Sequence, residues 1–132
     1  MDILSGLIPA PVWSYFEEIC KIPRLSKNEG KIRSKLLRFA EINNLDSKED
    51  SVGNILITKP ASPGFESTKT LVLQSHMDMV GEKNSGYPHN WLTDPIVPYI
   101  EGGFVRAMGT TLGADDGIGI ASQMAVLTDS GI

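Results

Sequence analysis

The sequence predicts an α/β protein in which a mixed sheet is covered by helices. Two helical patterns come first, runs typical of strands follow, and a third helical pattern lies near the end of the chain. This order is typical of a sheet covered by helices. The near-continuous apolar run Thr70–Ser75 supports it, because a strand buried on both faces loses the alternation of apolar and polar residues.

The first helix is predicted to follow a proline-containing segment that ends at Pro11. Apolar residues then lie on one helical face: Val12, Phe16, Ile19 and Cys20. Pro23 ends this helix, because proline lacks the amide proton that a helix interior requires. Cys20 is expected to be a small core residue.

A second helix is predicted after Ser26–Glu29, whose Ser-x-x-Glu pattern is that of a capping box. An apolar stripe follows at helical spacing: Ile32, Leu36, Phe39 and Ala40. The pair Asn43-Asn44 is the predicted end of this helix.

The remaining strands are predicted to be short. We expect one strand at Asn54–Thr58 and a hairpin in which Ile96–Ile100 and Phe104–Ala107 flank a tight turn. The turn is Glu101-Gly102-Gly103. The polar segment between residues 81 and 95 is predicted to be a surface loop.

The last helix is predicted from about Asp116 to Asp129. Its apolar residues leave little polar surface, so we expect it to be buried: Ile118, Ile120, Ala121, Met124, Ala125 and Leu127. A buried helix of this kind is normally followed by a further strand of the sheet. We therefore expect residues 1–132 to be the N-terminal segment of a longer catalytic domain, with no lid or dimerisation domain among them.

Composition excludes several classes of function. With 132 residues and a net charge of −4, the chain lacks the basic face that nucleic acid or an anionic membrane requires. No apolar run approaches the roughly 18 residues of a membrane span, and the first residues lack the basic flank of a signal peptide. A single cysteine fits a reducing cytoplasm, and with two histidines any metal chemistry must rely on carboxylates.

The first candidate site is the pair His76 and Asp78, directly after the predicted strand Thr70–Ser75. Residues two apart in extended chain point to the same face, so the carboxylate can hold one ring nitrogen while the other binds a metal. The alternative is a solvated polar pair at a strand end. Position favours the metal hypothesis, because ligands of open α/β sheets bind beyond the carboxyl ends of strands.

The second candidate is the glycine-rich stretch 109–119, which contains Asp115 and Asp116. A phosphate cradle is disfavoured, because two adjacent carboxylates without a nearby lysine repel phosphate. Asp115 as a turn residue and Asp116 as a helix N-cap would explain both carboxylates structurally. The functional hypothesis makes Asp115 a metal ligand and Asp116 mainly a cap. His89, in the polar loop, is expected to be a surface residue.

The ordered set resembles the N-terminal part of the co-catalytic zinc peptidases of the aminoacylase and dipeptidase superfamily, and within it the aminoacyl-histidine or cytosol non-specific dipeptidases. The resemblance rests on the apolar strand, His76-Met77-Asp78-Met79-Val80, the hairpin, and the stretch from Gly109 through Asp115-Asp116-Gly117. It implies an α/β metallopeptidase of the cytoplasm that hydrolyses dipeptides, including Xaa-His, and a homodimer formed through other segments.

The resemblance also implies roles for individual residues. His76 matches the terminal ligand of one zinc, Asp78 the carboxylate that backs this histidine, and Asp115 the carboxylate that bridges two zincs, with cobalt or manganese as alternative metals. The peptide bond after Asp115 is often cis in such enzymes. The family has three further features downstream: a Glu-Glu pair that supplies the general base, another acidic ligand, and a distant histidine. None of them has a counterpart after Asp115 in this sequence.

Three functions therefore stay open at the level of sequence. The first is dipeptide hydrolysis by a longer protein, with this chain alone inactive and a weak binder of zinc, because catalytic zinc sites need at least three protein ligands. The second is an N-acyl amino acid deacylase (an amidohydrolase) or a tripeptide aminopeptidase with the same di-zinc site. The third is a non-catalytic remnant or binding domain.

Overall fold

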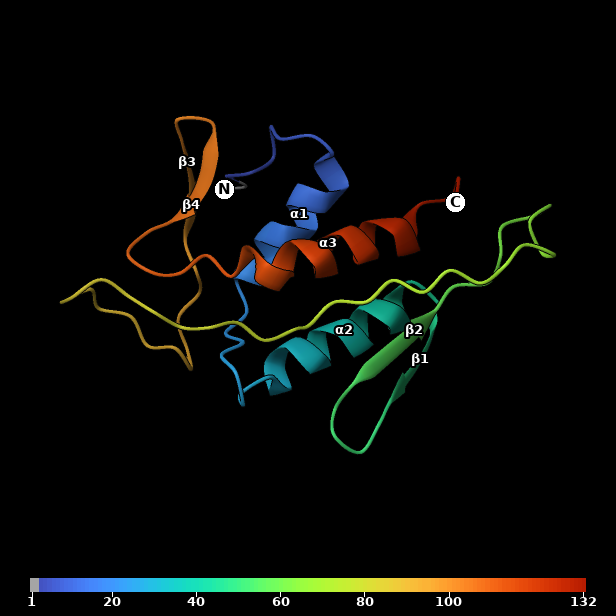
Figure 1. Cartoon of the computed structure of the whole chain (residues 1–132), viewed down its shortest axis with the longest axis horizontal. Helices are drawn as coiled ribbons and strands as arrows, with labels where there is room; N and C mark the ends of the chain where they lie inside the picture. The colour runs from blue at the N-terminus through green and yellow to red at the C-terminus, as the bar shows by residue number, and fades with distance from the viewer. Residues whose placement is uncertain (1–2) are drawn as a thin grey trace.

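A computed structural model describes residues 3–132 of the chain. Two helices that are far apart in sequence pack side by side at its centre: α1 (Ala10–Cys20) and α3 (Ala114–Thr128) (Figure 1). The third helix, α2 (Gly30–Ile42), lies beside a hairpin of β1 (Asp46–Glu49) and β2 (Ile55–Thr58). The predicted helices are thus all present, and the mixture of helices and strands confirms the α/β class.

The hydrophobic core lies between the inner faces of the helices. Phe16 and Ile19 of α1 and Ile32 of α2 are fully buried. The face of α3 that packs against α1 carries Ile120, Ala121 and Met124, all buried, so this helix is covered as predicted. Cys20 is 2% exposed and is a core residue, as expected from its position on the apolar face.

The strands form two separate antiparallel hairpins rather than one mixed sheet, within residues 3–132. In the first hairpin, Asp46 pairs with Thr58 and Glu49 with Ile55. Strand β1 was not predicted, because its four residues are polar and exposed and carry no apolar alternation. It forms because β2 offers a row of backbone partners.

The second hairpin joins β3 (Pro98–Glu101) to β4 (Phe104–Ala107) and confirms the predicted hairpin. Gly102 and Gly103 have φ of +59° and +81°, a region that residues with a side chain rarely adopt. Strand β3 begins at Pro98, two residues after the predicted start at Ile96. The reason is that Ile96 turns inward, where its amide donates to the carbonyl of Cys20 at 2.8 Å.

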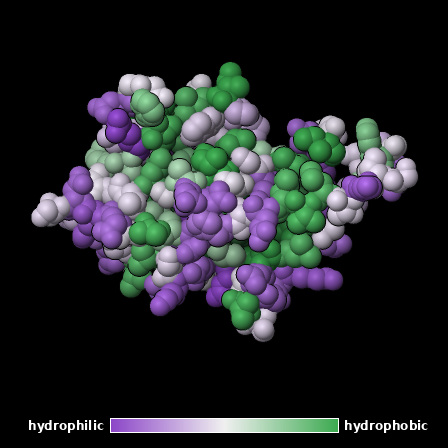
Figure 2. Space-filling model, in the orientation of Figure 1, coloured by the Kyte–Doolittle hydropathy of each residue, from purple (hydrophilic) through white to green (hydrophobic). Residues whose placement is uncertain are grey.

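The predicted strand Thr70–Ser75 is wrong for this chain. The segment is extended but belongs to no sheet, and it crosses the face between α3 and α2 (Figure 1). Its side chains at Leu71 and Val72 are 78% and 76% exposed. Figure 2 shows apolar surface on the same face of the molecule. A strand needs neighbours for its backbone groups, and residues 3–132 place none beside this one.

Within the same residues, no helix combines the length and the apolar character that crossing a membrane would require.

Candidate metal centre

The predicted site residues meet in one shallow hollow of about 320 Å³. Two segments form its walls: residues 76–80, after the extended segment, and residues 111–115, before α3. Their contributions are His76, Asp78, Met79, Val80, Thr111, Gly113, Ala114 and Asp115. Met79 is buried and Met77 is partly buried against the core, so the two methionines anchor the first wall from beneath.

His76 lies between two carboxylates. Its Nδ1 is 3.0 Å from Asp78 Oδ1, and its Nε2 is 2.9 Å from Asp115 Oδ1. The expectation that His76 and Asp78 share a face is therefore confirmed, and Asp115 approaches from the other wall. The hydrogen bond with Asp115, and then that with Asp78, raises the pKa of His76 above its ordinary value, against the opposing effect of burial.

Asp78 is held from its other side by Ser26. The Ser26 hydroxyl donates to Asp78 Oδ2 at 2.6 Å, and this bond, followed by the contact with His76, lowers the pKa of Asp78. The predicted capping box is therefore wrong: helix α2 begins at Gly30 without a side-chain cap, and Glu29 Oε1 instead accepts from the amide of Lys27. The serine of the Ser-x-x-Glu pattern therefore orients Asp78 of the site instead of capping a helix.

Asp115 and Asp116, at the start of α3, have different roles. Asp116 Oδ1 accepts from the amide of Gly119 at 3.1 Å, the bond that an N-cap side chain makes with the third helical residue. The two aspartates have non-helical backbone angles, and the peptide bond between them is cis. Asp115 makes no such cap, and its side chain is 95% exposed, so its second oxygen stays open to solvent.

Arg24 is a residue of the site that sequence reasoning missed. Its side chain is 2% exposed, and burial lowers its pKa. Nη1 donates to the carbonyls of Met77 and Asp78 at 3.1 and 3.0 Å, and Nη2 donates to the carbonyl of Gly113. One guanidinium thus contacts the backbone of both walls. An arginine one residue after Pro23 carries no sequence signal of this, because its partners lie more than fifty residues away.

The pair His76 and Asp115 fits part of a divalent metal site. Donor atoms that share one zinc at about 2.0–2.1 Å and tetrahedral angles lie about 3.3 Å apart, and Nε2 and Oδ1 are separated by 2.9 Å. A small movement would therefore let a cation replace the proton between them. No group of three or more histidine, cysteine or acidic side chains converges among residues 3–132, so a complete metal site would need further ligands.

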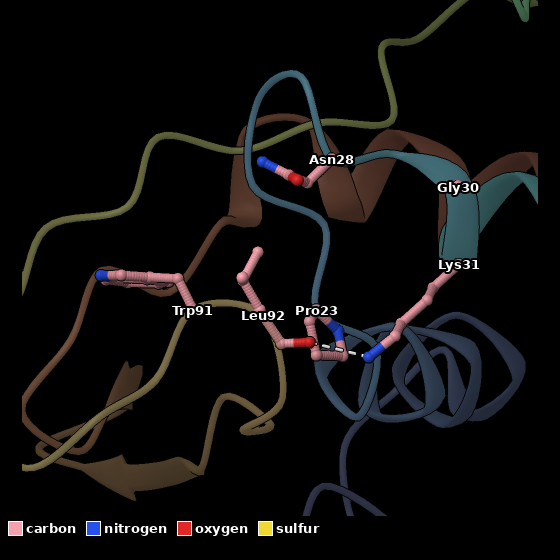
Figure 3. A pocket seen from close by; sticks show the side chains of 6 residues that line it. All are labelled: Pro23, Asn28, Gly30, Lys31, Trp91 and Leu92. Atoms are coloured by element: carbon pink, nitrogen blue, oxygen red, sulfur yellow. Dashed lines mark hydrogen bonds between the residues drawn. The ribbon is translucent and has the colours of Figure 1, made fainter.

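Two other features do not contribute to this site. His89 is half-buried rather than on the open surface, and its ring packs edge-on against Trp91 with centroids 4.4 Å apart. A second hollow of about 300 Å³ lies between Trp91 and the start of α2 (Figure 3). Lys31 reaches the carbonyl of Leu92 at its edge, and no carboxylate or imidazole lines it, so it offers a metal no ligand of the usual kind.

Comparison with known proteins gives related sequences. No family model matches the chain. The cytosol non-specific dipeptidase of Escherichia coli (strain K12) is 48% identical over 132 residues, which are 100% of this chain and 27% of that protein. The uncharacterized protein YqjE of Bacillus subtilis (strain 168) is 31% identical over 121 residues, covering 85% of this chain and 29% of that protein. The chain therefore spans less than a third of either curated relative.

Two solved structures share the fold of the chain. The aminoacylhistidine dipeptidase from Vibrio alginolyticus superposes with a TM-score of 0.95 at 48% identity, covering 98% of this chain and 26% of that one. A tripeptidase from Staphylococcus aureus subsp. aureus Mu50 superposes with a TM-score of 0.71 at 27% identity, covering 89% and 31%. The α/β arrangement described above is thus that of part of a larger peptidase structure.

Proposed function

We propose that this chain, a close homologue of cytosol non-specific dipeptidase over about a quarter of that protein's length, is part of a zinc-dependent dipeptidase. The observation that carries the proposal is the placement of His76 between Asp78 and Asp115. A surface histidine needs no such pair, whereas a metal-binding histidine is typically held by a carboxylate on the nitrogen that faces away from the metal. The relatives from E. coli and V. alginolyticus, both named dipeptidases, supply the substrate class.

In this proposal, the residues of the chain hold and orient. His76 Nε2 and the Asp115 carboxylate are the metal ligands, and the exposed Asp115 oxygen is available to a second ion. Asp78 keeps the proton of His76 on Nδ1, so that Nε2 presents its lone pair, and Ser26 fixes the carboxylate that does this. Asp116 is engaged by the helix amide of Gly119, which leaves Asp115 as the ligand of the pair.

Two zinc ions, when bound, supply Lewis acidity and lower the pKa of water, which is the chemistry that peptide hydrolysis at neutral pH requires. The Glu-Glu pair that the family resemblance implies downstream of Asp115 has no counterpart among residues 116–132, because the last glutamate of this sequence is Glu101. The general base and the remaining ligands are therefore assigned to other parts of the same protein, and residues 1–132 alone are expected to bind zinc weakly and to lack activity. We further propose a cytoplasmic location, as the name of the E. coli relative implies.

The test uses the full-length protein that contains this chain. It should release free amino acids from dipeptides, including Xaa-His dipeptides, lose this activity in a chelator and regain it with added zinc. A His76→Ala variant should lose both activity and one equivalent of tightly bound zinc, whereas His89→Ala, the matched change at the chain's other histidine, should keep both. Activity that survives exhaustive chelation would overturn the proposal.

A tripeptide substrate is the second candidate, favoured by the structural match to a tripeptidase. The two candidates share the metal site and differ in substrate length. Rates on a dipeptide, the same peptide extended by one residue, and the corresponding N-acetyl amino acid decide between a dipeptidase, a tripeptidase and a deacylase. The dipeptidase proposal requires that the dipeptide has the highest kcat/KM.

A further inference from the structure

We propose that Arg24 is a positioning residue of this metal site, which sets the distance between the two chain segments that carry the metal ligands. The inference rests on the proposed function, because it assumes that His76 and Asp115 bind the metal. Arg24 touches neither ligand side chain. It acts through backbone, by hydrogen bonds to carbonyls one and two residues after His76 and two residues before Asp115.

The contacts of the guanidinium span the gap between the walls of the hollow. Nη1 is 3.1 Å from the carbonyl oxygen of Met77 and 3.0 Å from that of Asp78, and Nη2 donates to that of Gly113. The backbone of Arg24 is tied to the first wall as well, because its carbonyl accepts from the amide of Met79 at 3.0 Å. The side chain therefore extends from a point fixed on one wall to the other wall.

The surroundings of the guanidinium are shaped to admit it. A Cβ added to Gly113 would lie 2.6 Å from Arg24 Nη2, and one added to Gly117 would lie at the same distance. Both approaches are closer than real Cβ contacts allow. The glycines on either side of Asp115 thus leave the room that a buried arginine needs, one in the loop and one in the first turn of α3.

A second connection between the walls lies farther from the ligands. Thr111 Oγ1 donates to the carbonyl of Val80 at 2.8 Å, and the amide of Thr111 donates to the carbonyl of Glu82 at 2.8 Å. These acceptors follow His76 by four or more residues, and Thr111 precedes Asp115 by four. A hydrogen bond restrains a ligand residue less as more residues of chain lie between them. Arg24, whose acceptors lie one or two residues from the ligands, therefore restrains the distance between His76 and Asp115 more directly than Thr111 does.

Arginine is suited to this task in a way that lysine is not. Its planar fork presents several N–H groups in fixed directions, so that one side chain satisfies carbonyls on two segments at once. A lysine ammonium is a point charge on a flexible stem. In Arg24→Lys the positive charge remains, but at least one of the three carbonyls loses its donor, so the two segments are held less closely near the ligands, although Thr111 still joins them farther away.

The experiment measures zinc affinity in the full-length protein by competition with a chromophoric chelator, well below the melting temperature. Arg24→Lys should weaken zinc binding about 10-fold or more, the range found when groups that orient metal ligands are changed. It should also alter the visible absorption of the cobalt-loaded protein, which reports ligand geometry. Gly117→Ala, which crowds the guanidinium from α3, should change both readouts in the same direction and serves if Arg24→Lys does not fold.

Glu17→Gln is the matched control. Glu17 is the other buried charged residue of the described part of the chain, and its carboxylate accepts from the amides of Ile3 and Leu4, away from the hollow. This variant should lower the melting temperature but leave zinc affinity within about twofold and the cobalt spectrum unchanged. If wild type binds zinc and Arg24→Lys binds it equally well, the positioning role is refuted. If wild type does not bind zinc, the proposed function itself fails.

Discussion

Replacing Asp78 by asparagine tests the orienting role of this carboxylate with the least change in shape. Asp78 Oδ1 faces His76 Nδ1 at 3.0 Å, and Oδ2 accepts from Ser26 at 2.6 Å. In Asp78→Asn the amide oxygen still accepts from His76. The amide nitrogen then faces Ser26, whose hydroxyl can turn to the carbonyl of Met79, 3.3 Å away, and accept from the amide. The hydrogen-bond pattern survives, and the negative charge is lost.

The magnitude follows from this separation of charge and geometry. Changes in groups that orient metal ligands weaken metal binding about 10–100-fold. Asp78→Asn retains the geometry, and 36% of the Asp78 side chain is exposed, so solvent screens part of the lost charge. We therefore expect about 10-fold, or ~1.4 kcal/mol. Asp78→Ala also removes the side-chain acceptor of His76 and leaves Nδ1 only the backbone carbonyl of residue 78, 3.2 Å away, so it should approach the 100-fold end of that range.

The assay is zinc affinity of the full-length protein by chelator competition, with Ser26→Ala as a control that removes the bond to Oδ2 and the longer bond to the Met79 carbonyl. A hydrogen bond to a charged group contributes about 1.5–3 kcal/mol to stability. Because Ser26→Ala keeps both the charge of Asp78 and its contact with His76, only part of this should reach the metal, and zinc binding should weaken less than in Asp78→Ala. Equal zinc affinities of Asp78→Asn and wild type would refute the reasoning. So would equal losses in Asp78→Asn and Asp78→Ala, because the first variant loses only the negative charge and the second also loses the side-chain acceptor of His76.

Three further outcomes are expected. In the metal-free protein, the pKa of His76 measured by NMR should lie above its ordinary value of 6.5 and should fall more in Asp115→Asn than in Asp78→Asn. The stability that protonated His76 contributes should be fully present below pH 6.5 and should disappear as pH rises through the raised pKa. A difference in melting temperature between His76→Gln and wild type that is the same at all pH values would contradict this. Burial raises the pKa of Cys20 to about 12, so a thiol reagent at pH 8 should label Cys20 only after denaturant is added, and fast labelling of the native protein would contradict its burial. The isolated chain should self-associate through the exposed apolar segment around Leu71 and Val72. Val72→Lys should therefore lower the molecular mass measured by sedimentation. Val52→Lys, the same change at an equally exposed valine in a turn, should leave that mass unchanged.

Local patterns in the sequence were sufficient for most of the helices and for half of the site. Helical spacing of apolar residues placed α1, α2 and α3, and the double glycine placed the β3–β4 hairpin. The contact between His76 and Asp78 followed from a separation of two residues in extended chain. These features depend on neighbours within a few positions, and their physical causes are therefore visible in a short window of sequence.

The misread elements depended on partners remote in sequence. Thr70–Ser75 has the composition of a buried strand, but a strand exists only when neighbouring strands take up its backbone groups, and residues 3–132 provide none there. Conversely, the polar segment β1 became a strand because β2 pairs with it. Propensity alone decides neither case.

The sequence by itself determined which residues could carry chemistry, and the tertiary structure decided what holds them. His76 and Asp115 are 39 residues apart and meet at 2.9 Å only when α3 packs against α1. Ser26 reaches Asp78 across 52 residues, and Arg24 reaches Gly113 across 89. A serine in a capping pattern and an arginine after a proline look ordinary in sequence. Their roles arise because folding buries the Arg24 guanidinium and partly buries Ser26. Buried polar groups must find polar partners, and the partners within reach are the groups that build the site.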